Sequence, residues 1–254
     1  MPDSPALAIV LAAGKGTRMK SDLPKVLVPA CGRPMVRYVI DALRAAGVGR
    51  IVVVVGYRSD LVREELADEP GVEFAEQTEQ LGTGHAVMMC REQLAGHSGP
   101  VVIVTGDSPL LQPSSVGKLL AETTAKDAAC VLGTIERDDP DGFGRIVRDD
   151  QGQFTGIVEQ KDATPQQLAI REVNASTYVF DAQALLGALD QLTSENAQGE
   201  YYVTDCPAIM LAEGRTVLAL PALSPQESLS VNRVEDLPPV EAALVELGYA
   251  GRGG

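Results

Sequence analysis

Short apolar segments rich in Val and Ile alternate along this chain with segments of helical periodicity. Segments with the composition of strands lie at residues 8–12, 51–55, 101–105 and 129–134, and helical patterns lie between them at residues 35–46, 60–66, 85–94 and 114–125. Strands that are apolar throughout are buried on both faces. When such strands alternate with helices, they form a mostly parallel sheet covered by helices. The pattern therefore predicts an α/β fold with a mostly parallel, mixed sheet and helices on both faces.

Beyond residue 134 the pattern changes. Two short strand-like segments around a turn at residues 149–152 predict an antiparallel hairpin. Further strands and helices follow at residues 173–180, 181–189, 203–212, 217–220 and 235–247. We expect residues 1–234 to form the main domain, with residues from about 135 to 200 inserted as a small antiparallel subdomain over the ligand-binding edge of the sheet. Residues 235–254 are expected to add a C-terminal helix and a frayed tail.

The loop at residues 11–19 (LAAGKGTRM) follows the first predicted strand, and Lys25 comes shortly after it. Gly14 and Gly16 leave backbone N–H groups uncovered, and Arg18 and Lys25 add positive charge. In such sheets ligands bind outside the carboxyl ends of the strands. A glycine-rich, basic loop at that place predicts a polyphosphate site.

This loop does not fit the two commonest phosphate-binding patterns. The dinucleotide pattern G-x-G-x-x-G would need a third glycine where Met19 stands, and an acidic residue at the end of the second strand, where Gly56 and Tyr57 follow Val55. The P-loop pattern G-x-x-x-x-G-K-[ST] also fails, because Gly16 follows the first Gly-Lys pair. Both readings are therefore excluded.

Charge and composition exclude other classes of partner. The net charge is −14, yet the first 50 residues hold eight basic and three acidic side chains. An acidic protein with a locally basic start suits a small anionic ligand, and argues against nucleic acid or an anionic membrane. No apolar run is long enough to cross a membrane, and the start resembles no signal peptide. The four cysteines are too scattered for a zinc site or a disulfide framework. We expect a cytoplasmic protein.

The loop at residues 11–19, with Lys25, resembles the signature of the sugar-nucleotide pyrophosphorylases. Further matches over nearly the whole chain resemble the bacterial N-acetylglucosamine-1-phosphate uridylyltransferases. The resemblance implies the Rossmann-like nucleotide-diphospho-sugar transferase fold and the formation of UDP-N-acetylglucosamine and pyrophosphate from UTP and N-acetylglucosamine 1-phosphate. It implies catalytic roles for Arg18 and Lys25, which would neutralise charge on the phosphates. The loop residues implied to contact the triphosphate are Leu11, Ala12, Ala13, Gly14 and Gly16.

The segment at residues 79–86 (EQLGTGHA) resembles the uracil-binding segment of the same enzymes. The resemblance implies that Gln77, Gly82 and Thr83 contact the edge of the base and places Gln80 beside them. An amide side chain offers both a donor and an acceptor, as the O and N–H groups of uracil require. We also expect the Thr83 side chain to cap the helix that follows.

The strand at residues 101–105 ends at Thr105 and is followed by Gly106 and Asp107. This sequence resembles the Gly-Asp that follows the corresponding strand in the family. The resemblance implies substrate contacts for Thr105 and Gly106, a catalytic role and Mg²⁺ binding for Asp107, and a second metal ligand in Asn232. A hard dication prefers oxygen ligands, and one carboxylate with substrate phosphates is a usual arrangement for Mg²⁺.

The resemblance also implies that Gly144, Glu159 and Asn174 contact the N-acetylglucosamine moiety, and gives residues 198–205 a structural role. Two departures affect this pocket. Ser176 stands where relatives usually carry glycine, and Thr105 where they often carry tyrosine. The exact sugar is therefore left open.

The bifunctional relatives continue into a β-helix of hexapeptide repeats, and such repeats are missing from this sequence. We therefore expect no acetyltransferase activity and a monomer. The alternatives are transfer to another sugar 1-phosphate, use of dTTP or another triphosphate, and a non-catalytic sensor of sugar nucleotides. The sensor is disfavoured because a pure binder has no use for the full set of Arg18, Lys25, Asp107 and Asn232.

Overall fold

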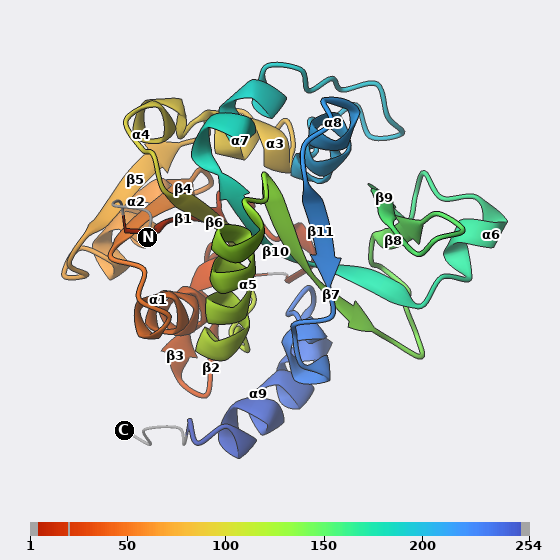
Figure 1. Cartoon of the computed structure of the whole chain (residues 1–254). Helices are drawn as coiled ribbons and strands as arrows, with labels where there is room; N and C mark the ends of the chain where they lie inside the picture. Colours follow the sequence, from red (N-terminus) through yellow and green to blue (C-terminus); the bar gives the residue numbers. More distant parts are fainter. Residues whose placement is uncertain (1–4, 20, 250–254) are drawn as a thin grey trace.

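A computed structural model describes residues 5–19 and 21–249. One nine-stranded sheet forms the centre of this part of the chain, with its main strands in the order β11-β7-β10-β6-β1-β4-β5 (Figure 1). The main strands are β1 (Leu7–Ala12), β4 (Arg50–Val55), β5 (Val72–Glu76), β6 (Pro100–Thr105), β7 (Cys130–Glu136), β10 (Glu172–Asp181) and β11 (Val217–Leu220).

The sheet is mixed but mostly parallel, as predicted. Strand β1 pairs in parallel with β4 and with β6, while β10 runs antiparallel to β6 and β7. In this register Leu11 lies opposite Thr105 on β6, and Ala12 lies opposite Val55 on β4. The carboxyl ends of these strands therefore meet at one edge of the sheet, where the loops that follow them are brought together.

Helices cover both faces of the sheet. Buried residues of α3, α4, α7 and α8 belong to the core on one face, and those of α1, α2 and α5 belong to the core on the other. The α-helices are α1 (Met35–Ala45), α2 (Ser59–Glu65), α3 (Thr83–Met88), α4 (Arg91–Ala95), α5 (Pro113–Lys126), α6 (Pro165–Leu168), α7 (Ala182–Leu189), α8 (Cys206–Ala212) and α9 (Leu237–Glu246). None of the helices in the described residues is long and apolar enough to cross a membrane.

The predicted hairpin consists of β8 (Arg145–Arg148) and β9 (Phe154–Val158). It pairs with β10 through β8, and with α6 it projects beside one end of the sheet (Figure 1). The expected C-terminal helix corresponds to α9, which packs on a third buried cluster. The predicted frayed tail lies outside the described residues, and the domain bounds stay a prediction.

Smaller elements lie in the segments between the main strands and helices. A short hairpin joins β2 (Pro29–Ala30) to β3 (Arg33–Pro34). Five 3₁₀-helices lie in the described loops: η1 (Thr17–Met19), η2 (Lys25–Leu27), η3 (Val203–Asp205), η4 (Pro225–Ser228) and η5 (Val234–Asp236).

The prediction of one continuous helix over residues 85–94 is wrong. Residues 85–94 are divided between α3 and α4, because the chain tightens into turns in which Met89 N–H donates to Ala86 O and Cys90 N–H to Val87 O. The helix also begins two residues early, at Thr83, so Gly82 holds the capping position. The predicted cap by the Thr83 side chain is therefore wrong.

Candidate active site

The glycine-rich loop is fixed at its start by both neighbouring strands. Leu11 O accepts a hydrogen bond of 2.9 Å from Gly106 N–H, which follows β6, and Ala13 O accepts one of 3.1 Å from Tyr57 N–H, which follows β4. Because these carbonyls are held from two sides, the loop leaves the sheet in a defined direction at the edge where ligands bind.

The two glycines of this loop, Gly14 and Gly16, have different structural roles. Gly16 has φ +63°, and a Cβ there would lie 2.7 Å from Lys25 Cβ, so glycine lets the Lys25 stem pack against the loop. A Cβ at Gly14 would have no heavy atom within 4 Å. Gly14 therefore presents open backbone to the hollow in front of the loop.

Lys25 brings together the two predicted metal ligands. Its ammonium forms an ion pair with the Asp107 carboxylate and donates a hydrogen bond of 2.8 Å to Asn232 Oδ1. The Asn232 amide nitrogen donates to Ser230 Oγ at 3.1 Å, which turns its oxygen toward Lys25. Arg18 also reaches this oxygen, at 3.5 Å. Segments from the start, middle and end of the chain therefore converge on one charged point.

The donor set at this point fits a hard divalent cation. The Asp107 carboxylate and the Asn232 amide oxygen already face a common cationic group, the Lys25 ammonium. Within residues 5–19 and 21–249, no group of three or more His, Cys, Asp or Glu side chains could hold a metal ion. A cation at Asp107 would therefore take its remaining ligands from substrate oxygens and water, as Mg²⁺ commonly does.

A hollow of about 650 Å³ lies in front of the glycine-rich loop. That volume is within the usual range for a small-molecule site. Thirteen of the predicted site residues line it: Leu11, Ala12, Ala13, Gly14, Gly16, Arg18, Lys25, Gln77, Gln80, Gly82, Thr83, Thr105 and Asp107.

At one end of this hollow, Gln77 is held by local hydrogen bonds. Its side chain is only 3% exposed, and its Nε2 donates to Gly82 O at 3.1 Å and lies 3.0 Å from His85 Nδ1. Gln80 Nε2 donates to Gln77 O at 3.3 Å. The two contacts of Nε2 fix the orientation of the Gln77 side-chain amide, which is what recognition of a base edge requires.

The segment after Gln77 is also held from a part of the chain that sequence reasoning treated only as structural. Tyr201 N–H donates to Leu81 O at 2.8 Å, and Gly84 N–H donates to Tyr201 O at 2.7 Å. The Thr83 hydroxyl accepts from Val203 N–H at 3.1 Å. The Thr83 side chain is thus a fixed point between the two segments.

A second hollow of about 210 Å³ continues from the first. The predicted site residues that line it are Thr105, Asp107, Gly144, Glu159, Asn174 and Asn232. The two hollows share Thr105 and Asp107. Gly106 lines neither; a Cβ there would lie 3.0 Å from Val26 Cγ1, so its small size serves packing.

Glu159 lies half-buried in the second hollow. Burial raises the pKa of its carboxyl group above the ordinary value of 4.5, and the neighbouring carboxylates of Asp205 and Asp162 raise this pKa further, against a hydrogen bond from Thr204. The Thr204 hydroxyl donates to Glu159 Oε1 at 3.2 Å. A Cβ at Gly144 would lie 3.4 Å from the same oxygen. The absence of a side chain there keeps the carboxylate open to the hollow.

Asn174 and Ser176 form the opposite wall. Asn174 is 5% exposed; its Nδ2 donates to Tyr178 Oη at 2.6 Å, and its Oδ1 accepts from Ser176 N–H at 3.1 Å. Ser176 has φ +53°, a conformation that favours glycine, and lies where the β10–β7 pairing shifts register. Ser176 thus lines the second hollow with a strained backbone conformation.

Sequence reasoning missed some lining residues of this hollow. Glu227, Ser228 and Ser230 line it together with Asn232. The only signal was their place just before the predicted metal ligand Asn232. A buried glutamate in a loop is unusual enough to be noticed, but burial is not visible in one sequence.

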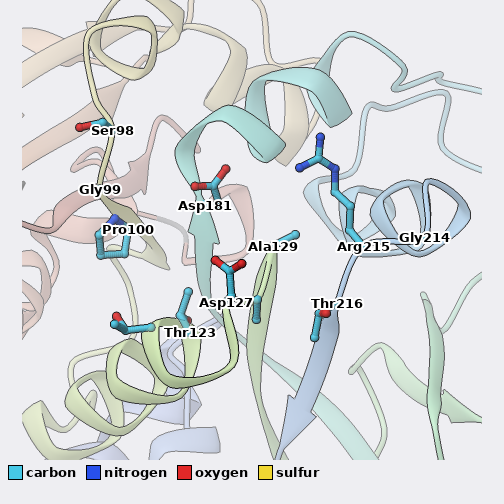
Figure 2. A pocket seen from close by; sticks show the side chains of 12 residues that line it. Ser98, Gly99, Pro100, Thr123, Asp127, Ala129, Asp181, Gly214, Arg215 and Thr216 are labelled. Carbon is cyan, nitrogen blue, oxygen red and sulfur yellow. The ribbon is translucent and has the colours of Figure 1, made fainter. Parts of the chain in front are cut away.

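Another hollow, of about 640 Å³, lies at the opposite edge of the sheet, beside the amino ends of β6, β7 and β11 (Figure 2). Asp127, Asp181 and Arg215 surround it. Asp181 accepts a hydrogen bond of 2.8 Å from Ala184 N–H and caps α7, and Arg215 pairs with Glu213. Because parallel sheets bind ligands at the carboxyl edge, and these side chains serve local structure, the active site is assigned to the two joined hollows.

Comparison with known proteins identifies the family. Residues 8–204 match the family described as the MobA-like NTP transferase domain. The chain is 46% identical over 237 residues to the bifunctional protein GlmU of Exiguobacterium sp., which covers 93% of this chain and 52% of that protein. The proteins of the same name from Heliobacterium modesticaldum and Trichlorobacter lovleyi are 47% and 48% identical and cover 93% and 89% of the chain. The chain spans about half the length of these relatives.

The fold has a close counterpart among solved structures. A UDP-glucose pyrophosphorylase complexed with UDP-glucose superposes with a TM-score of 0.77 at 16% sequence identity, covering 96% of this chain and 99% of that one. This likeness confirms the predicted nucleotide-diphospho-sugar transferase fold, and the relatives confirm the resemblance drawn from the motifs. The matching family is described as an NTP transferase domain, which gives the general class of chemistry as transfer from a nucleoside triphosphate. The chain belongs to the family of MobA-like NTP transferase domains.

Proposed function

We propose that this chain transfers the uridylyl group of UTP to N-acetylglucosamine 1-phosphate, forming UDP-N-acetylglucosamine and pyrophosphate. One observation carries the proposal. The first hollow is lined by the glycine-rich loop and by residues of the segment 77–83, to which we assign recognition of the base and which we call the base-recognition segment. It joins the second hollow, which is lined by Glu159 and Asn174, and Asp107 lines both. A site for a nucleoside triphosphate and a site for a sugar phosphate thus meet at one carboxylate.

The reaction needs positioning more than covalent help. A sugar-phosphate oxygen forms a bond to the α-phosphorus of UTP, the bond from that phosphorus to the bridging oxygen breaks, and pyrophosphate leaves with the electron pair. The attacking phosphate is already largely anionic near neutral pH. No general base is required, and His85, which contacts Gln77, serves the base-recognition segment.

The basic residues match this need for charge neutralisation. Arg18 and Lys25 lie beside the loop that would enclose the triphosphate, and Lys25 reaches the point where the two hollows meet. Preorganised positive charge at the transferred phosphoryl group stabilises the transition state. We assign these two residues to the α-phosphate and the leaving pyrophosphate.

The metal ion is part of the proposal, with Mg²⁺ as the ion. Asp107 and Asn232 would hold it, since their oxygens already converge on a cation. When bound, it supplies a positive charge that polarises and aligns phosphate oxygens. Asp107 lines both hollows, and the orientation of Asn232 is fixed by its hydrogen bond to Ser230.

Pyrophosphate release with a matrix of substrates tests the function. UTP, dTTP and CTP are each combined with N-acetylglucosamine 1-phosphate, glucose 1-phosphate and galactose 1-phosphate, with Mg²⁺ and a coupled pyrophosphate assay. We expect the highest kcat/KM with UTP and N-acetylglucosamine 1-phosphate. A preference for dTTP contradicts the base assignment, and binding of sugar nucleotides without pyrophosphate release supports the sensor instead. A monomeric, cytoplasmic enzyme is part of the proposal, and light scattering checks its oligomeric state.

A further inference from the structure

Glu227 is a buried carboxylate with three hydrogen-bond donors around it. Its side chain is 6% exposed. Oε1 accepts from Gln112 N–H at 2.9 Å, and Oε2 accepts from Ser115 Oγ at 2.8 Å and from Ser224 N–H at 2.7 Å. None of the ion pairs in the described part of the chain includes this carboxylate. The groups that donate to it are therefore two backbone N–H groups and one hydroxyl.

Two of these donors, Gln112 and Ser115, lie where the loop that follows Asp107 enters α5. Gln112 precedes the first turn of α5 and ends the loop that begins at Asp107, within which Leu111 N–H donates to Ser108 O at 3.2 Å. Gln112 is the N-cap of α5, so the Glu227 carboxylate lies at the amino end of this helix. Glu227 thus contacts the far end of the Asp107 loop directly.

The other loop carries Asn232, five residues after Glu227. Ser224 N–H and Glu227 Oε2 close the turn of η4, and Ser228 Oγ donates to Pro225 O at 2.6 Å within it. From there the chain runs through Ser230 to Asn232. The Glu227 carboxylate therefore connects, through its hydrogen bonds, the loop that carries Asp107 to the loop that carries Asn232.

We propose that Glu227 is a positioning residue that sets the distance between Asp107 and Asn232. Although Glu227 lines the second hollow, both of its oxygens accept hydrogen bonds from the protein, and it acts through the two loops that these bonds connect. The inference rests on the proposed function, because it gives Asp107 and Asn232 their roles as metal ligands. Supporting groups behind metal ligands typically contribute about 10-fold to 100-fold in activity or metal affinity.

Glu227→Gln tests the proposal while keeping the shape of the side chain. An amide presents one acceptor and one donor, so its NH₂ group must face either Gln112 N–H or Ser224 N–H in any orientation. One of the two loops is then pushed away. We expect kcat to fall about 10-fold to 100-fold with KM for UTP within about threefold, and the dissociation constant for Mn²⁺ to rise by a similar factor as kcat falls.

The Mn²⁺ constant is measured by electron paramagnetic resonance, with the protein alone and with a UTP analogue that has a methylene bridge between the α- and β-phosphates. Asp181→Ala is the matched control, because it removes a helix cap at the opposite edge of the sheet (Figure 2). It should lower the melting temperature without changing kcat or the Mn²⁺ constant. Ser115→Ala removes a single hydrogen bond to Glu227 and gives a milder version if the first variant folds poorly.

A purely structural role gives a different result. If Glu227→Gln melts earlier, as Asp181→Ala does, but keeps its kcat per folded molecule and its Mn²⁺ constant, the proposal is overturned. Failure of the proposed function is distinguishable, since it appears in the wild-type protein as no pyrophosphate release with any substrate pair. The Mn²⁺ constants of wild type and Glu227→Gln still test the spacing of the loops in that case.

Discussion

Lys25 Nζ lies 2.8 Å from Asn232 Oδ1, although 207 residues separate them in the sequence. The same ammonium pairs with Asp107, at the end of the central strand β6. Both partner groups are oxygen ligands that would suit a metal ion, and the Lys25 stem is held by close packing at Gly16. The charged point that we propose as catalytic is therefore built where segments from near the start, middle and end of the chain meet at the carboxyl edge of the sheet.

Removal of either charged partner should abolish most of the activity without unfolding the protein. We expect Lys25→Ala and Asp107→Ala each to lower kcat by about 10²–10³, the usual effect of removing one preorganised charge. Circular dichroism should show a normal fold. Arg50→Ala is the control: it removes the ion pair with Glu73, which is half exposed at the other edge of the sheet, and should leave kcat unchanged. Near-normal transfer by Asp107→Ala would contradict the metal assignment.

Gly14→Ala should separate ligand contact from folding. The new methyl group meets no protein atom within 4 Å, so the melting temperature should stay close to that of wild type. If the triphosphate approaches this backbone, the methyl group blocks it, and KM for UTP should rise on the order of tenfold. Gly117→Ala, inside α5 and equally free of contacts, is the matched control. It should stabilise the fold by about 0.5–1 kcal/mol with unchanged KM. An unchanged KM in Gly14→Ala would place the triphosphate elsewhere.

Ser176→Gly should relax the second hollow. A side chain in the left-handed region costs about 1–2 kcal/mol of folding free energy. Glycine avoids this cost, but its larger conformational freedom in the unfolded state offsets part of the gain. The free energy of unfolding should therefore rise by no more than about 1 kcal/mol. The larger hollow should favour the bulkier sugar, raising the kcat/KM ratio of N-acetylglucosamine 1-phosphate to glucose 1-phosphate by about tenfold.

The control for this change is Asp127→Gly. Asp127 has φ +47° and follows α5 at the opposite edge, so it offers the same backbone relief without touching the hollow. Its sugar preference should equal that of wild type. An unchanged ratio in Ser176→Gly, measured in the pyrophosphate assay, would remove Ser176 from the selection of the sugar.

The sequence allowed the strands and the first loop to be predicted because their signals are local. Apolar runs mark β1, β4, β6 and β7, which are buried on both faces. Strand β5 was missed because it lies at the end of the strand order and is only partly buried, so its composition does not stand out. His97, in the loop between α4 and β6, is only 7% exposed. Its burial follows from tertiary packing that no local pattern records.

The site was predicted in part, and for a different reason. Asp107 and Asn232 were brought together by resemblance to a family, since their sequence separation gives no physical sign of contact. The hydrogen bonds that hold these site residues in place could not be predicted. Tyr201 and Val203 bond to residues 81–84, and Glu227 bonds to Gln112, only once distant segments meet in the fold. A carboxylate buried among neutral donors looks, in the sequence, like any exposed glutamate.

Glu159 gives a prediction with a definite sign in pH. Its pKa is raised by burial first, and then by Asp205 and Asp162. A carboxyl group whose pKa is raised on folding favours the fold when protonated, and this contribution is lost as the pH rises through the folded pKa. Glu159→Gln should therefore be more stable than wild type at pH 8, and the advantage should shrink as the pH falls toward 4.5. Asp205 and Asp162 stay in both proteins, so the difference isolates Glu159.

Glu73→Gln should show the opposite trend. The Arg50 guanidinium lowers the pKa of Glu73, so its stabilising contribution is present above the ordinary range and is lost as the pH falls through the folded value. Urea unfolding of the three proteins at pH 8, 6 and 4.5 checks both signs.

Glu159→Gln should also raise KM for the sugar phosphate about tenfold, because the hydroxyl groups of the sugar lose a charged acceptor. If Glu159→Gln is less stable than wild type at pH 8, the pKa of Glu159 is not raised on folding.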